Sequence, residues 1–186
     1  MKVGTSRSTL PMTYDEYALL PQDRNRYEVI EGELHMTPSP PLAHQNVVIE
    51  LGSMLRQHVS ASGLGKVYVA PLDVVLTETN VVQPDILFLR AARVPPKGAK
   101  NVTVAPDLVV EVISPSSVEE DRGAKMRVYA RHGVSHYWLV DPEARTLEMY
   151  ALAGGAYAAA GAFSGGATAT TPLFPGLTIP LAGLWA

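Results

Sequence analysis

Two apolar runs constrain the fold of this chain most strongly. They are residues 108–113 (LVVEVI) and residues 81–89 (VVQPDILFL), and each is almost unbroken. A strand that is covered on both faces carries such a run, whereas a half-exposed strand alternates apolar and polar residues. We therefore expect both runs to form strands inside a sheet that helices cover.

The order of the predicted elements favours an α/β fold with a mixed sheet (α+β). Residues 44–60 predict a long helix, because their apolar side chains recur at helical spacing. The other predicted elements are helices at 12–20 and 118–132, two strands within 27–36 that join at Gly32, and strands at 67–76, 136–140, 146–152 and 177–181. One mixed sheet with two flanking helices is the simplest packing of this order.

Length and composition bound the class of protein. The 186 residues suffice for a flexible N-terminal tail, residues 1–11, and a single domain over residues 12–186. Cysteine is absent, which excludes disulfides, thiolate zinc sites and cysteine nucleophiles. A formal net charge of −3 argues against a surface that binds nucleic acid through a coat of basic residues. The net charge does not exclude an enzyme that binds a phosphodiester locally through metal ions.

The two ends of the chain differ in composition: the N-terminal residues lack a long apolar run, and the C-terminal residues carry no charge. No secretory signal is visible at the N-terminus, so we expect a cytoplasmic protein that does not contact a membrane. Residues 149–186 carry no charge, but glycines and prolines interrupt any segment long enough to span a bilayer. This stretch predicts either a homodimer interface or local hairpins that fold back on the chain.

Carboxylates inside the two apolar runs are the strongest functional signal. Glu111 lies in the middle of one run and Asp85 lies within the other. An ionised carboxylate withdrawn from water costs several kcal/mol unless a cation or several donors compensate it. Each acid alone could sit at a sheet edge or pair with an arginine, but two on neighbouring strands favour a metal ion or a lysine between them. Asp73 is a third such acid, but the nearby Pro71 favours a bend or an exposed position for it.

Basic residues near these acids carry weaker signals. Lys125 follows on the helix after the Glu111 strand, but Asp121 at i−4 favours an ordinary surface ion pair. His44 begins the long helix, where it could bond near the site, cap the helix or pack. His132 and His136 flank Gly133, which breaks their helical alignment, and no HExxH motif is present. A zinc hydrolase is therefore not expected.

Several segments together resemble a known nuclease superfamily. VVQPDILFL, DLVVEVISPSS and DRGAKMRVYARHGVSHYWLVDP resemble the PD-(D/E)xK superfamily, in particular its Uma-type branch of restriction endonucleases. YEVIEGELHMTPSP and LFPGLTIPL also match that branch, so the resemblance covers residue 12 to the C-terminus. It implies a restriction-endonuclease-like αβββαβ core with an extra N-terminal hairpin and C-terminal strands.

The resemblance also implies a metal site. Asp85 and Glu111 match the acids that hold a divalent metal, and the backbone carbonyl of Ile113 is a further expected ligand. The superfamily's lysine normally occupies the position of Ile113, so the plain motif is broken; in the Uma-type branch the lysine lies on the next helix, which implies Lys125. Three acids compete for the role of an additional ligand: Glu50, Glu33 and Glu28.

The function implied is hydrolysis of DNA by a Mg²⁺-dependent endonuclease, with Mn²⁺ as an alternative ion. Asp85 and Glu111 would hold the metal, and Lys125 would orient water or stabilise charge. His44, Gln83 and Tyr129 are expected in supporting roles near the site, and the partners expected are weakly bound DNA and a second copy of the chain. The alternative is a catalytically silent module that uses a nuclease fold for binding or assembly.

Overall fold

The computed structural model describes residues 10–21, 23, 25–115 and 117–186. The predicted flexible tail, residues 1–11, therefore lies outside the described residues except for Leu10 and Pro11. The division into a tail and one domain over residues 12–186 stays a prediction.

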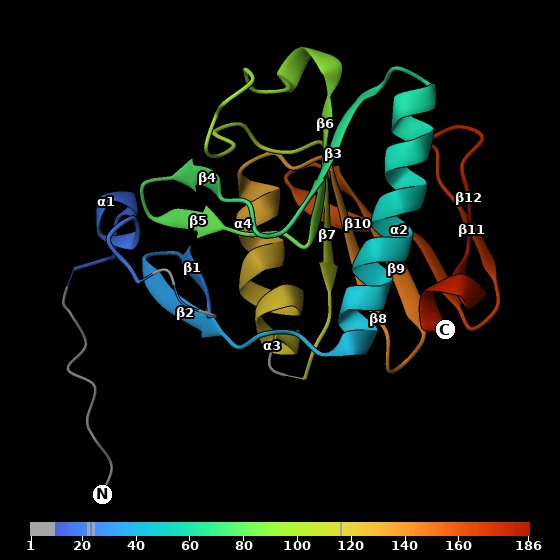
Figure 1. The fold of residues 1–186 in the computed structure, drawn as a ribbon, viewed down its shortest axis with the longest axis horizontal. Helices are drawn as coiled ribbons and strands as arrows, with labels where there is room; N and C mark the ends of the chain where they lie inside the picture. Colours follow the sequence, from blue (N-terminus) through green and yellow to red (C-terminus); the bar gives the residue numbers. More distant parts are fainter. Residues whose placement is uncertain (1–9, 22, 24, 116) are drawn as a thin grey trace, which may run out of the picture.

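A six-stranded sheet forms the centre of the molecule (Figure 1). Its strand order is β10-β9-β8-β7-β6-β3. The strands are β3 (Gly65–Val69), β6 (Ile86–Arg90), β7 (Leu108–Val112), β8 (His136–Asp141), β9 (Thr146–Ala153) and β10 (Ala156–Ser164). Strands β7 and β8 pair in parallel and the other neighbours pair antiparallel. Every residue of β7 is buried, as its unbroken apolar run predicted.

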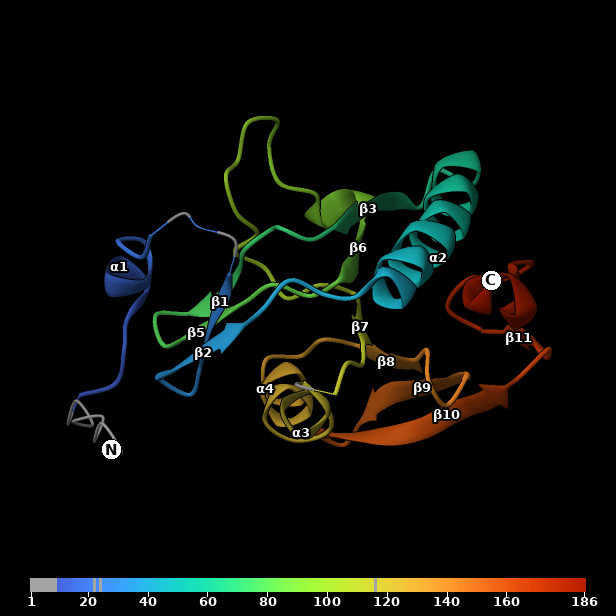
Figure 2. The ribbon, with the colours of Figure 1, turned by 60° about the horizontal axis from the view of Figure 1, so that its bottom comes forward.

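One face of this sheet is covered by the long helix and the end of the chain. These elements are α2 (Leu42–Ala61), β11 (Thr168–Thr170), β12 (Thr178–Pro180) and the 3-10 helix η3 (Leu181–Trp185). Leu51 of α2, Phe88 of β6, Trp138 of β8 and Phe174 share one buried apolar cluster. Figure 2 shows α2 and the C-terminal segment on the same side of the large sheet.

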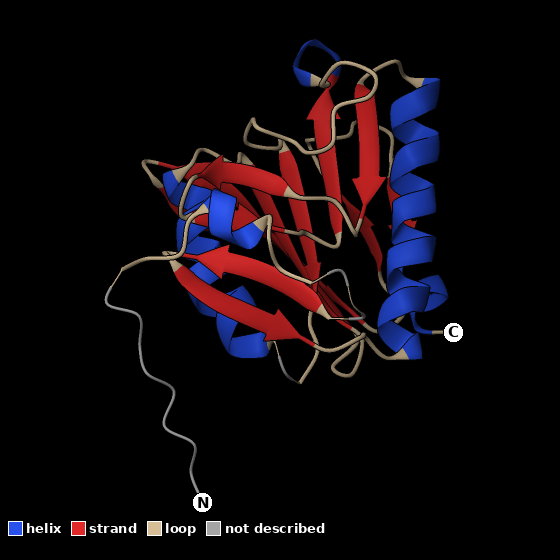
Figure 3. Cartoon of the chain, turned by 60° about the vertical axis from the view of Figure 1, so that its left-hand side comes forward, coloured by secondary structure: helices blue, strands red, loops and turns tan. Residues whose placement is uncertain are grey.

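The opposite face carries the second helical segment and a smaller sheet. The helical segment comprises α3 (Val118–Glu120), the π-helical turn η2 (Asp121–Lys125) and α4 (Met126–Arg131). The four-stranded sheet has the order β2-β1-β5-β4, with β1 (Arg26–Ile30), β2 (Glu33–Thr37), β4 (Val74–Thr77) and β5 (Asn80–Val82). Its strands cross those of the large sheet steeply (Figure 3). Leu87, Val109 and Tyr129 lie in the core on this side.

Two predicted strands are each split between the two sheets, so the expected single sheet was wrong. Residues 67–76 become β3 and β4, and residues 81–89 become β5 and β6. Pro71 and Pro84 lie at the breaks. Proline has no N–H to donate to a sheet ladder, so each strand stops there and the chain crosses to the other sheet. The predicted mixed α/β class is confirmed.

Shorter elements complete the chain. They are α1 (Tyr14–Tyr17) and the 3-10 turn η1 (Ala91–Arg93). A capping box begins α1, with the N–H of Thr13 donating to the Glu16 carboxylate at 2.8 Å. None of the helices in the described ranges is long and apolar enough to cross a membrane.

The uncharged stretch, residues 149–186, forms most of the hairpin β9–β10 and all of the hairpin β11–β12. Its large apolar residues Phe174, Ile179 and Leu184 are buried against α2 and the sheet. Local hairpins are therefore the alternative that the structure supports for this stretch.

Candidate active site

Asp85 and Glu111 are brought together by the pairing of β6 with β7. Ile86 pairs antiparallel with Val110, so Asp85 and Glu111 are the next residues outward on the two strands and project from the same face. Both carboxylates are buried. The side chain of Arg26 on β1 bridges them: its Nη1 lies 2.7 Å from Asp85 Oδ1 and its Nη2 lies 3.5 Å from Glu111 Oε2.

Lys125, at the end of the π-helical turn, places its ammonium among Glu111 and two further acids, Glu28 and Asp121. Its Nζ lies 3.0 Å from Glu28 Oε2, 3.2 Å from Asp121 Oδ1 and 3.4 Å from Glu111 Oε1. The side chain of Lys125 is only 4% exposed. The expectation of an ordinary surface pair with Asp121 was therefore wrong: the pair exists, but both residues are buried because the π-helical turn directs them toward the sheet.

Four carboxylates thus converge from four parts of the chain. We call them the carboxylate cluster: Glu28, Asp85, Glu111 and Asp121. Glu28 is anchored on β1, where its Oε1 accepts a 2.7 Å hydrogen bond from the backbone N–H of Gln83.

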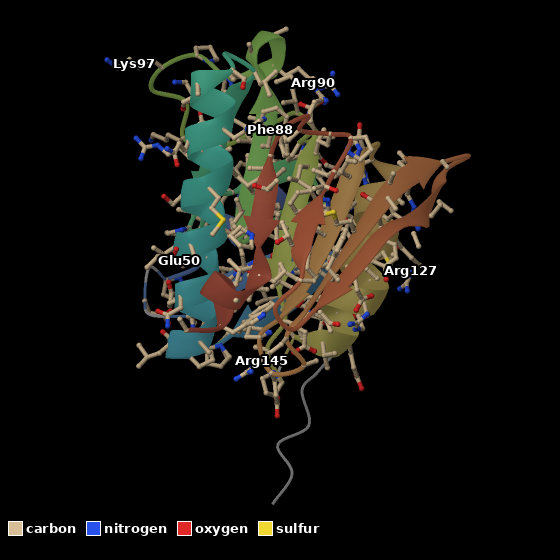
Figure 4. All side chains as sticks on the ribbon, turned by 90° about the vertical axis from the view of Figure 1, so that its right-hand side faces the viewer. Glu50, Phe88, Arg90, Lys97, Arg127 and Arg145 are labelled. Atoms are coloured by element: carbon tan, nitrogen blue, oxygen red, sulfur yellow. The ribbon has the colours of Figure 1, made fainter. Side chains whose placement is uncertain are left out.

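Of the three acids considered as an additional ligand, the structure places only Glu28 in the cluster. Glu33 lies on β2 with its side chain exposed. Glu50 lies on the outer, exposed face of α2, away from the sheet (Figure 4). Glu33 cannot reach the cluster because β1, and not β2, docks against the large sheet. Glu50 cannot reach it because α2 buries the opposite face of the helix.

His44 and the β7 backbone hold Asp85 in place. His44 Nε2 lies 3.1 Å from Asp85 Oδ2, and the N–H of Val112 donates to the same oxygen at 2.7 Å. Because a carboxylate oxygen only accepts, Nε2 is the protonated nitrogen of His44 in this contact. His44 could have bonded near the site, capped the helix or packed, and the structure shows that it contacts the site.

Tyr129 and Gln83 contact the cluster in different ways. Tyr129 is fully buried and donates a 2.7 Å hydrogen bond to Glu111 Oε1. Gln83 contributes only its backbone, since its side-chain amide donates to Asp73 at 2.7 Å. Asp73 also accepts from Tyr17, so this acid belongs to a separate hydrogen-bond network.

Burial raises the proton affinity of two members of the cluster. Burial is the main cause that raises the pKa of Glu111 to about 8; the Lys125 ammonium opposes it, and the neighbouring Asp121 and Asp85 carboxylates add to it. Burial also raises the pKa of Asp121 above its usual range, against the charge of Lys125. Glu111 and Asp121 therefore take up a proton more readily than exposed carboxyl groups do.

The pKa values of Asp85 and Lys125 shift in the directions that favour their ionised forms. Burial alone would raise the pKa of Asp85, but the hydrogen bond from His44 and the charge of Arg26 hold it well below its usual range. Burial alone would lower the pKa of Lys125, but the carboxylates of Glu111 and Glu28 raise it above its usual range. Lys125 is therefore an ammonium at neutral pH.

Two neighbouring cavities border the cluster. The smaller, of about 220 Å³, is lined by all four carboxylates and by Lys125. The larger, of about 860 Å³, is lined by Tyr14, Tyr17 and Asn101 among others. Both are lined by Arg26, His44 and Asp85, so the larger cavity meets the cluster at these residues.

Within the described ranges, no group of three or more His, Asp or Glu side chains is arranged to hold a metal ion. The reason is visible in the contacts: the carboxylate oxygens face Arg26 and Lys125 instead of one shared point. Ile113 does not line the smaller cavity, and its side chain packs in the core beside α4. Its carbonyl as a metal ligand stays a prediction.

Comparison with known proteins identifies the family of this chain. The model of the Uma2 family, described as "Putative restriction endonuclease", matches residues 14–182, which include the whole cluster and both of its cations. The chain belongs to the Uma2 family. The resemblance predicted from the sequence is thereby confirmed.

Two individual proteins are similar to this Uma2 chain. A crystal structure from Anabaena variabilis ATCC 29413, described as a putative nuclease belonging to DUF820, matches with a TM-score of 0.80 and 24% identity, covering 94% of this chain and 98% of that one. At this identity the likeness shows the fold. A Synechocystis protein, described as "Uncharacterized protein slr1290", is 27% identical over 131 residues, which are 69% of this chain and 67% of that protein.

Sequence reasoning missed two members of the site, Arg26 and Asp121. Arg26 had a signal, because residues two apart on a strand share a face and Glu28 was already a candidate. Asp121 was noticed only as the i−4 partner of Lys125. Its burial depends on the π-helical turn, which the spacing of apolar residues does not reveal.

Proposed function

We propose that this Uma2 protein is a Mg²⁺- or Mn²⁺-dependent endonuclease that hydrolyses phosphodiester bonds of DNA at the carboxylate cluster. The observation that carries the proposal is the convergence of four buried carboxylates around two cations, Arg26 and Lys125, from β1, the segment before β6, β7 and the π-helical turn. Membership of a family described as restriction endonucleases supports the same activity.

The residues fit a hard divalent cation in both chemistry and charge. Carboxylate oxygens are the donors that Mg²⁺ and Mn²⁺ prefer. Four carboxylates share the charges of Arg26 and Lys125, so two acids of the cluster lack a positive counterpart when all are ionised. Asp85 and Glu111 would hold the ion, with Glu28 and the Ile113 carbonyl as further candidates. A bound divalent ion supplies an activated water and neutralises charge that develops on the phosphate.

Lys125 has a role that follows from its protonation state. Its neighbours hold it as an ammonium, so it donates hydrogen bonds and cannot act as a general base. We propose that its Nζ orients the attacking water or stabilises the negative charge of the transition state. Tyr129 and His44 fix the orientation of Glu111 and Asp85 by hydrogen bonds, and so position the two acids.

Metal titration tests the proposal directly. Isothermal calorimetry with Mn²⁺ should show binding to the wild-type chain and its loss in Asp85→Asn and Glu111→Gln. Glu50→Gln is the matched control, because it removes an exposed carboxylate of the same chain and should leave binding unchanged. Equal binding by all four proteins would overturn the metal site.

Cleavage assays then test the reaction. Single-stranded, double-stranded and branched DNA are incubated with Mg²⁺ or Mn²⁺, and we expect cleavage that Lys125→Ala abolishes. Undiminished cleavage by Lys125→Ala would contradict the role given to the lysine.

A catalytically silent module is the second candidate function. The observation that favours it is the contact of Arg26 with three of the carboxylates, because such a network could be purely structural. A folded wild-type chain that binds neither Mn²⁺ nor Mg²⁺ and cleaves none of the three DNA forms would support this candidate instead.

A further inference from the structure

Arg26 lies where three carboxylates of the cluster meet. Its Nη1 is 2.7 Å from Asp85 Oδ1, while its Nη2 is 3.5 Å from Glu111 Oε2 and 3.6 Å from Glu28 Oε1. Nη2 also donates to the backbone carbonyl of Gln83. One guanidinium therefore contacts carboxylates from β1, β7 and the segment before β6 through its two terminal nitrogens.

The remaining oxygens of Asp85 and Glu111 are already engaged. Asp85 Oδ2 accepts from the N–H of Val112, and Glu111 Oε1 accepts from the hydroxyl of Tyr129. This leaves Asp85 Oδ1 and Glu111 Oε2, and both of these oxygens contact Arg26. A metal ion that binds both acids through these two oxygens competes with Arg26 for them.

We propose that Arg26 is a resident cation at the metal position, and that a divalent ion binds as the guanidinium leaves. Two cations cannot share these oxygens without strong mutual repulsion, so Arg26 sets the metal affinity of the cluster. The inference rests on the proposed function, because it assigns the metal to the same Asp85 and Glu111.

Arg26, and not Lys125, is placed to leave. The side chain of Arg26 is 21% exposed, whereas that of Lys125 is 4% exposed. Arg26 also lines the larger cavity of about 860 Å³, which offers the guanidinium a place outside the cluster. Lys125 lines only the smaller cavity of the two and stays to balance Glu28 and Asp121.

Calorimetric titration with Mn²⁺ tests the exchange on the full chain. Arg26→Gln should bind Mn²⁺ with a dissociation constant lower than that of the wild type by about ten-fold or more, since a competing charge has been removed. Arg131→Gln is the matched control: Arg131 lies on α4 and pairs with the exposed Glu31 at 3.0 Å, so its loss should leave Mn²⁺ affinity unchanged.

The outcomes separate this inference from the proposed function. If the wild type binds Mn²⁺ and Arg26→Gln binds it equally or more weakly, the role of Arg26 is overturned while the metal site stands. An absence of binding in the wild type and in Arg26→Gln overturns both. Tighter binding by Arg131→Gln to the same degree would also overturn the inference, because the effect would then be one of net charge.

A measurement on the wild-type chain avoids any dependence on the folding of Arg26→Gln. In a Mg²⁺ titration followed by ¹H–¹⁵N NMR, the Arg26 Nε–H signal, assigned with Arg26→Lys, should move together with the amide signal of Val112, which reports on Asp85. A shift of Val112 with an unchanged Arg26 signal would show metal binding without displacement and overturn the inference. If neither signal moves, the proposed metal site at Asp85 and Glu111 is overturned together with the role of Arg26.

Discussion

Lys125 is charged, yet its ammonium lies among three buried carboxylates, at 3.0 to 3.4 Å from Glu28, Asp121 and Glu111. Removing one partner from a buried ion network is strongly destabilising, because the remaining charges are left without compensation. The contacts that keep Lys125 charged for its proposed role are therefore expected to stabilise the fold as well.

Lys125→Met should therefore lower the free energy of unfolding by about 3–5 kcal/mol, since uncompensated acids remain buried. Urea denaturation of the metal-free protein measures it. Lys97→Met, at an exposed loop position, is the control and should change the stability little. A loss for Lys125→Met no larger than that of the control would show that the network does not stabilise the fold.

Tyr129 offers a milder test at the same scale. Tyr129→Phe keeps the buried ring and removes the donor to Glu111 Oε1, so stability should fall by about 1–3 kcal/mol. Tyr27→Phe, which removes an exposed hydrogen bond from the tyrosine hydroxyl to Asp23, is the control and should cost less. Equal losses in the two variants would argue against a special role for the buried hydrogen bond.

Among the elements, the π-helical turn η2 supplies two charged members of the site. It brings Asp121 and Lys125 into the cluster, between α3 and α4 of what would otherwise be one helix. π-Helical turns inside α-helices occur frequently at functional sites. Gly123 lies in the middle of this turn.

Gly123→Ala should stabilise the protein by about 0.5–1 kcal/mol, because alanine has fewer unfolded conformations and an added Cβ would meet only Arg127 Nη1, at 3.8 Å. Gly65→Ala should have the opposite effect, since its φ is +154° and its Cβ would lie 2.0 Å from the Leu89 carbonyl oxygen. Thermal unfolding of both variants measures the contrast. Destabilisation by Gly123→Ala would mean that this turn needs glycine.

The elements also show how far sequence reasoning could reach. The apolar runs around Asp85 and Glu111 were enough to predict two buried acids on neighbouring strands with a cation between them. That the two side chains share one face depends on the register of β6 and β7, which the runs do not reveal. The choice among Glu28, Glu33 and Glu50 depended on which strand of the N-terminal hairpin docks on the sheet. That is a property of tertiary packing, and no local pattern encodes it.

At the scale of the whole molecule, the large sheet ends in an open edge. Strand β10 pairs with β9 on one side, and the described part of the chain places no strand on its other side. Its residues carry no charge and are mostly exposed. An uncharged open edge favours pairing with another strand.

We therefore retain the homodimer as a prediction, with β10 as its contact. Sedimentation at micromolar concentration should give the mass of a dimer, and Ala158→Glu and Ala162→Glu should shift it toward the monomer. Ser60→Glu, on the exposed side of α2, should leave the mass unchanged. A monomeric mass for the wild type would contradict the prediction.

A crystal structure soaked with Mn²⁺ tests the central claim most directly, since anomalous scattering locates the ion without assumptions about activity. We predict an anomalous peak between Asp85 and Glu111, the guanidinium of Arg26 displaced toward the larger cavity, and Lys125 still among its carboxylates. Carboxylates that keep their ion pairs with Arg26, with no anomalous peak between them, would contradict the account.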